Sequence, residues 1–181
     1  MFDLAKNYFE LFGLPVGFII DGAELAGRYR ELQRVVHPDR YANATEQEQR
    51  LSLQQATRIN EAFETLKNPV TRAQYLLSLH GIDMQAEKET TRNTAFLMEQ
   101  LQLREELENA RYAEHPEDVL DELMGRISAM IRTLVAQMAI KFEDPSPPNL
   151  EAARETVRKM QFLNKLLSEA ESLEAELEDM Y

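Results

Sequence analysis

Apolar residues recur at intervals of three and four through almost the whole chain, and this spacing restricts the possible folds more than any other feature. It places apolar side chains on one face of a helix, because an α-helix completes a turn in about 3.6 residues. Two stretches show the spacing clearly: Leu25, Tyr29, Leu32 and Val36, then Ala56, Ile59, Phe63 and Leu66. Glycine and alternating β-type patterns are scarce, whereas Leu, Glu, Gln, Arg and Ala are abundant. The sequence therefore predicts an all-α protein.

The pattern of residues 1–78 predicts a helical hairpin flanked by short helices. A first helix is expected within AKNYFELFG, where Gly13 ends it, and the segment TRAQYLLSL forms the last one. Pro38 ends the first hairpin helix, because the residue before a proline disfavours helical geometry. Two helix starts carry a capping-box pattern: Asp21 with Glu24, and Thr45 with Glu48. Two antiparallel helices joined by HPDRYANA are the simplest arrangement of these signals.

Residues 79–87, which include Gly81, predict a hinge to a second domain over residues 88–181. Three long helices are expected there, over residues 88–111, 116–141 and 149–179. The prolines of EDPSPPN are expected to exclude helix between the last two, and Asn149 to cap the third. Long helices with short breaks predict an antiparallel three-helix bundle or a hairpin-like coiled coil.

The composition excludes several kinds of chemistry. The chain has no cysteine, and His37, His80 and His115 lack ligand spacing, so we expect neither a disulfide nor a metal site. A formal charge of −12 argues against nucleic-acid binding. No apolar run of about 18 residues and no secretory signal pattern occurs. We therefore expect a cytoplasmic protein with protein partners, no membrane contact and no cofactor.

The segment VVHPDRY, residues 35–41, is the most distinctive stretch of the chain. The dense basic cluster of this acidic protein surrounds it: Arg28, Arg30 and Arg34 precede the loop, and Arg40 follows it. A cationic helix face beside an exposed loop suits docking on an acidic protein surface. Alternatively, His37 could cap a helix end and the arginines could form an ordinary solvated face. A catalytic His–Asp pair is a poorer explanation, because no serine or cysteine nucleophile motif accompanies it.

These residues resemble a known module. YRELQRVVHPDR, followed by INEAFETLKNPVTRAQYL, is similar to the J-domain, which activates ATPase chaperones of the DnaK type. NYFELFGLP resembles the first helix of that module, and the similarity covers roughly residues 6–77. The resemblance implies that His37, Pro38 and Asp39, with the basic face of the preceding helix, stimulate ATP hydrolysis in a partner. Lysine is common where Arg40 stands, and the charge is kept.

The first helix of the second domain has two contrasting faces. At about 100° per residue, one face carries Phe96, Gln100, Leu103 and Leu107, which we expect in the core. The roughly opposite face carries Leu97, Met98, Leu101 and Glu105, and Phe162 lies beside the stripe Met160, Leu163, Leu167 and Ala170 of the last helix. This pattern predicts an exposed apolar patch suited to protein docking. A homodimer seam or a wider core would give the same pattern.

TAFLMEQLQLREEL and TVRKMQFLNKLLSEAESLEAEL resemble the C-terminal domain of the HscB family, the J-type co-chaperones of iron–sulfur cluster assembly. Members of that family bring the scaffold IscU to the chaperone HscA. By resemblance, the scaffold-binding positions are Leu97, Met98, Leu101, Glu105 and Phe162. Gln102 stands where a close relative has a glutamate, so one charged contact of the family is missing.

The leading interpretation is a non-enzymatic adaptor without a cofactor. Its first domain would contact an HscA-like ATPase chaperone, and its second domain would hold an IscU-like scaffold. The alternative is a coiled-coil protein that self-associates through its C-terminal helices and uses its J-like domain for a different client. An enzyme is the third and weakest interpretation.

Overall fold

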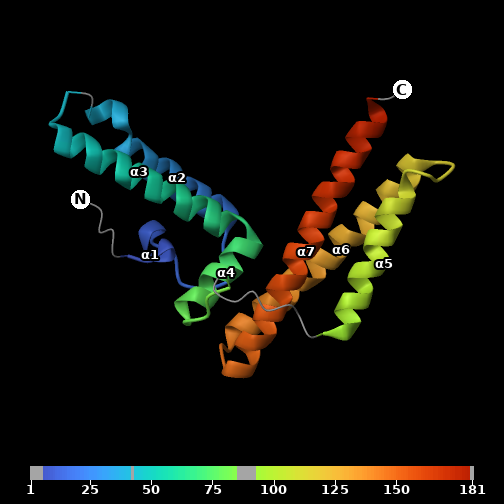
Figure 1. The fold of residues 1–181 in the computed structure, drawn as a ribbon. Coiled ribbons are helices and arrows are strands. Elements are labelled where there is room, and N and C mark those ends of the chain that lie inside the picture. The colour runs from blue at the N-terminus through green and yellow to red at the C-terminus, as the bar shows by residue number, and fades with distance from the viewer. Residues whose placement is uncertain (1–5, 42, 85–92, 180–181) are drawn as a thin grey trace. The chain divides into compact units, whose positions relative to one another are not determined.

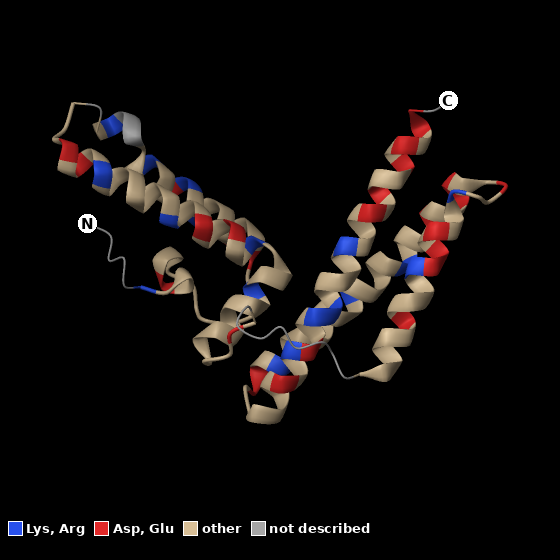
Figure 2. Ribbon diagram, viewed as in Figure 1, with Lys and Arg blue, Asp and Glu red and all other residues tan. Residues whose placement is uncertain are grey.

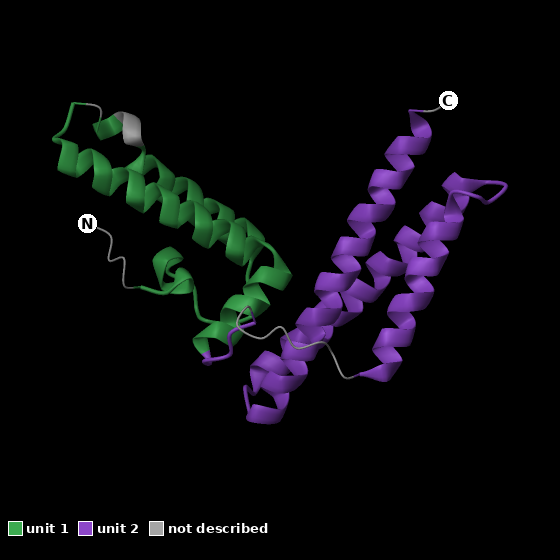
Figure 3. Cartoon of the chain, in the orientation of Figure 1, with its two compact units in different colours: residues 1–79 green, residues 80–181 purple. Residues whose placement is uncertain are grey.

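The computed structural model describes residues 6–41, 43–84 and 93–179, and every regular element within them is a helix, as predicted (Figure 1). The chain divides into two compact units, residues 1–79 and 80–181 (Figure 3). Each unit buries its own set of apolar side chains. Part of the predicted hinge, residues 85–87, lies outside the described residues.

The first unit is a helical hairpin with two accessory helices. Its elements are α1 (Tyr8–Phe12), α2 (Gly22–Val36), a 3₁₀ turn (Pro38–Tyr41), α3 (Glu46–Lys67) and α4 (Pro69–Leu79). α2 packs against α3, and α1 and α4 also contact α3. The two apolar stripes meet as predicted: Leu25, Val36, Ile59 and Leu66 are buried. The rings of Tyr29 and Phe63 stack with centroids 4.1 Å apart.

α1 starts later than the expected segment AKNYFELFG, at Tyr8, because Asn7 and Glu10 form a capping box that the sequence reading missed. The Asn7 side chain accepts the backbone N–H of Glu10, and the Glu10 carboxylate accepts the N–H of Asn7, both at 2.9 Å. The helix ends at Gly13 as predicted. Gly13 has φ +66°, a left-handed conformation that favours glycine.

The second unit is an antiparallel three-helix bundle, which confirms the first of the two predicted arrangements. It consists of α5 (Thr94–Ala110), α6 (Pro116–Glu143) and α7 (Pro147–Glu178). α6 and α7 form the most extensive pair, and the shorter α5 packs on both. The core comprises Leu103, Leu107, Ala110, Leu120, Leu123, Ile127, Leu163, Leu166, Ala170, Leu173 and Leu177. Asn93 caps α5, and residues 88–92 of the predicted helix lie outside the described residues.

The predicted start of the last helix is wrong. α7 begins at Pro147, with Ser146 at the N-cap position, so Asn149 is not the cap. Proline is favoured in the first turn of a helix, because the N–H groups there need no intrahelical partner. Asn149 instead donates its side-chain N–H to the carbonyl of Asp144 at 2.8 Å, which fixes the turn between α6 and α7.

Among the described residues, α6 is the one helix long and apolar enough to cross a membrane, judged by length and composition alone. In the structure its Leu120, Leu123, Ile127 and Met138 are buried. A single helix of this kind is weak evidence for a membrane span, because helices that pack in a bundle pass the same test.

Candidate partner-binding surfaces

The segment of residues 37–39, His-Pro-Asp, lies in the turn between the two long helices of the first unit. α2 ends at Val36, His37 leaves the helix with φ −56° and ψ 128°, and Pro38–Tyr41 continue as a 3₁₀ turn. His37 and Arg40 are exposed. The side chains of Pro38 and Asp39 lie outside the described part of the structure. The helix therefore ends where the sequence predicts, and it places His37 at the surface.

Several contacts hold the base of this turn. The hydroxyl of Ser52, which is 2% exposed, donates to the carbonyl of Val36 at 2.8 Å. The Arg40 guanidinium donates to the backbone carbonyl of Arg34 at 2.9 Å. The Arg40 backbone N–H donates to the backbone carbonyl of His37 at 3.0 Å. The last turn of α2 thus finds partners for its carbonyls in side chains of neighbouring elements. Sequence reasoning missed Ser52, whose signal is a small polar residue on the buried face of α3.

The far end of the loop is also fixed. Thr45 and Glu48 form the predicted capping box at the start of α3. The backbone N–H and the hydroxyl of Thr45 donate to the Glu48 carboxylate at 2.9 and 2.8 Å. These hydrogen bonds lower the pKa of Glu48 from its ordinary value, because they favour the charged carboxylate.

We expect Ser52→Ala to lower the free energy of unfolding by about 1–3 kcal/mol, because the buried carbonyl of Val36 would lose its hydrogen-bond partner. Urea unfolding measures the change. Ser78→Ala is the matched control, since Ser78 is exposed and donates within α4 to Tyr75. An equal effect of the two substitutions would contradict the anchoring role of Ser52.

The predicted basic cluster divides into two faces of α2. Arg30 and Arg34 are exposed on the side opposite the buried stripe, about 40° apart at about 100° per residue. Arg28 lies well away from them and forms exposed ion pairs with Glu24 at 3.7 Å and Glu31 at 3.9 Å. Arg28 therefore does not share the face of Arg30 and Arg34, and its role in chaperone binding stays a prediction. Arg30 and Arg34 on α2 and Arg40 in the turn that follows are all exposed.

The two faces of α5 are arranged as the sequence predicts, except that Gln100 on the core face and Leu97 on the other face are half-buried. Phe96, Leu103 and Leu107 are buried. On the opposite side Met98 is 57% and Leu101 64% exposed. Glu105 and Gln102 are also exposed, and Leu97 is half-buried. The second unit therefore presents apolar side chains to solvent on α5.

Phe162 differs from the expectation, because its ring is half-buried rather than exposed. It packs edge-on against Phe96, with ring centroids 5.9 Å apart. The Arg104 guanidinium lies 5.6 Å from the centre of the Phe162 ring and pairs with Glu169 at 3.3 Å. Lys159 covers the Phe96 ring at 5.0 Å. Phe162 thus joins α7 to the first turns of α5 and forms a wall beside the exposed patch.

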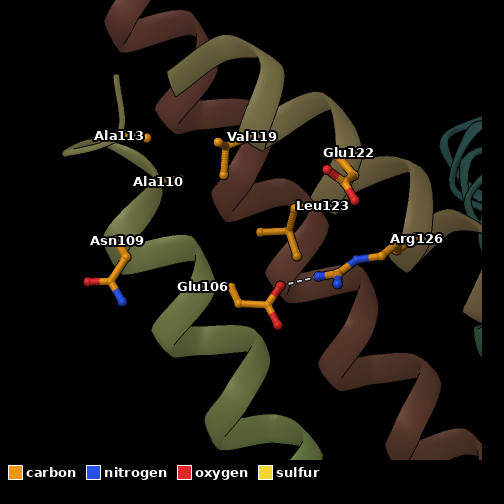
Figure 4. Close-up of a pocket in the computed structure, with 8 residues that line it drawn as sticks. All are labelled: Glu106, Asn109, Ala110, Ala113, Val119, Glu122, Leu123 and Arg126. Carbon is orange, nitrogen blue, oxygen red and sulfur yellow. Dashed lines mark hydrogen bonds and ion pairs between the residues drawn. The ribbon is translucent and has the colours of Figure 1, made fainter. Parts of the chain in front are cut away.

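An open groove of about 330 Å³ lies between α5 and α6 (Figure 4). Its floor includes Ala110 and Leu123, and an ion pair between Glu106 and Arg126 crosses it. Within the described ranges no group of three His, Cys, Asp or Glu side chains is placed to hold a metal ion.

Comparison with protein families assigns both halves of the chain. Residues 7–75 match the DnaJ domain. Residues 92–171 match the family model described as the HSCB C-terminal oligomerisation domain. The first match ends within α4, and the second begins just before α5.

Solved structures show similarity over both units. Chaperone HscB from Vibrio cholerae shares 42% sequence identity, with 95% of this chain and 99% of that chain covered and a TM-score of 0.84. The human co-chaperone HscB shares 30% identity, with 93% and 82% covered and a TM-score of 0.83. The Jac1 co-chaperone from Saccharomyces cerevisiae, at 23% identity, 92% and 97% coverage and a TM-score of 0.70, shares the fold.

Proposed function

Because the chain belongs to the HscB family of J-domain co-chaperones, we propose that it stimulates the ATPase of an HscA-like chaperone and delivers an IscU-like iron–sulfur scaffold to it. The observation that carries the proposal is the presence of two exposed candidate surfaces on two separate compact units. One is the turn at His37 in the first unit, and the other is the apolar face of α5 in the second.

The first surface fits an acidic site on the chaperone. Arg30 and Arg34 are exposed beside the turn and enter no ion pair among the described residues. Complementary charges speed encounter and fix orientation. A ligand shifts a conformational equilibrium only by binding one state more tightly. The turn would therefore favour the hydrolysis-competent state of the chaperone, and the chemistry would take place in the partner.

The second surface fits a protein client. An apolar patch edged by charge is typical of docking surfaces, and Met98 and Leu101 supply its most exposed apolar area. Leu97 and Phe162 would border the contact, and Glu105 would add charge. Holding the scaffold on the adaptor raises its effective concentration near the chaperone.

We expect the double substitution Met98→Ala and Leu101→Ala to weaken binding of the purified IscU-like scaffold about thirtyfold, from about 1 kcal/mol for each side chain. Calorimetric titration measures this change. We prefer this pair to Phe162, whose removal would also damage the contact with Phe96. Ile140→Ala on α6 is the control, because Ile140 is 67% exposed on another helix. Wild-type affinity in the double variant would exclude this face.

Self-association is the second candidate role of the same unit, because the matching family model is described as an oligomerisation domain. The exposed face of α5 would then be a seam between copies of the chain. Light scattering of the wild type and the double variant separates the two roles. A wild-type mass that stays that of a monomer at all concentrations favours client binding, whereas an oligomer that the substitutions dissociate favours the seam.

A further inference from the structure

A row of exposed side chains continues the patch on α5 to the far end of the bundle. It consists of Met98, Leu101, Glu105, Glu108 and Tyr112. Their spacing is three, four, three and four, which places the four residues of α5 within about 80° of one another at about 100° per residue. Tyr112 follows the end of α5, and its backbone N–H donates to the carbonyl of Asn109, which extends the last turn. We call this row the α5 strip.

Tyr112 borders a groove at the end of the α5 strip. The groove has a volume of about 520 Å³ and lies between α5 and α7, with Leu107 and Leu173 in its lining. Both leucines are nearly buried, whereas Tyr112 is 82% exposed. Two ion pairs join the helices along this side, Arg104 with Glu169 at 3.3 Å and Arg111 with Glu176 at 3.7 Å. The groove therefore has leucine side chains in its lining, ion-paired Arg111 and Glu169 on its walls, the carboxylate of Glu108, which is unpaired among the described residues, and an aromatic ring at its edge.

The middle of the α5 strip is acidic. Glu105 and Glu108 are exposed, and neither enters an ion pair among the described residues. Acidic residues also gather at the end of the bundle where α5 meets α6 (Figure 2). A partner that covers the strip must bring positive charge to its centre, because burying two carboxylates without a partner is costly.

We propose that the α5 strip docks one segment of the scaffold, with apolar side chains at both ends and Lys or Arg between them. This inference rests on the proposed function and extends its site by the groove at Tyr112. The strip spans about 21 Å at about 1.5 Å per residue, which sets the separation of the two apolar ends. Tyrosine at the rim of a groove is a frequent energetic anchor.

Two substitutions test the inference by calorimetric titration with the purified IscU-like scaffold. We expect Tyr112→Ala to weaken binding about tenfold, the size of a strong interface contact. We expect Glu108→Lys to weaken binding more than Glu122→Lys, which makes the same change of net charge on α6. The difference between the two charge reversals should shrink as the salt concentration rises, since exposed charges are screened.

The controls separate this inference from the proposed function. Val119→Ala removes an apolar side chain at the same end of the bundle, 39% exposed on α6, and should leave the affinity unchanged. If Tyr112→Ala and Glu108→Lys bind like the wild type while Met98→Ala with Leu101→Ala binds weakly, the extended strip is refuted and the proposed function stands. If the Met98 and Leu101 pair also binds like the wild type, the proposed client face fails as well.

Discussion

The His37→Gln variant should leave the ATPase of the HscA-like chaperone at its unstimulated rate. His37 is exposed and lies just beyond the last residue of α2, so the substitution removes the imidazole without opening the core. The turn keeps the contacts of Ser52 with Val36 and of Arg40 with Arg34. Steady-state ATP hydrolysis by the chaperone, measured against increasing co-chaperone, detects the loss. Stimulation of ATP hydrolysis equal to that by the wild-type co-chaperone would refute the role of the turn.

Two controls make the His37 result specific. His80→Gln alters an exposed histidine outside the turn and should stimulate the chaperone like the wild type. Binding of the scaffold to His37→Gln should also be unchanged, because the α5 face belongs to the other unit. Loss of both activities would instead indicate that the variant is misfolded.

Most of the fold could be predicted because periodicity and capping act locally. Leu25 and Val36 are buried where the stripe of α2 requires it, and Thr45 with Glu48 opens α3 as the pattern indicates. The start of α7 was missed because proline has two roles. It breaks a helix interior but fits a first turn, and only the conformation around Pro147 decides between them.

The candidate sites were predictable as helix faces but not as contacts. Met98 and Leu101 are exposed because they lie opposite Phe96 and Leu103 on one helix. The packing of Phe162 against Phe96 joins α7 to α5, so the pattern of one helix does not predict it. Ser52 shows the same limit, since its partner lies sixteen positions earlier in sequence. Pairing across helices requires the tertiary structure.

We expect Leu166→Ala to lower the stability of the second unit by roughly 2–5 kcal/mol. Leu166 is fully buried and belongs to the core cluster formed by α5, α6 and α7. Removing its side chain leaves a cavity that the surrounding helices fill only in part. Urea unfolding followed by far-ultraviolet circular dichroism should show that part of the helical signal is lost at a lower urea concentration.

Tyrosine signals distinguish the unit that the Leu166 substitution affects. Four of the six tyrosines lie in residues 1–79, and the chain has no tryptophan, so near-ultraviolet circular dichroism follows mainly the first unit. Its midpoint should stay unchanged in Leu166→Ala, because the two units have separate cores. Leu167→Ala is the neighbouring control and should cost less, since Leu167 is half-buried. An equal fall of the tyrosine midpoint would mean that the units unfold together. If they unfold separately, Leu166→Ala at intermediate urea should lose scaffold binding while the turn at His37 stays folded.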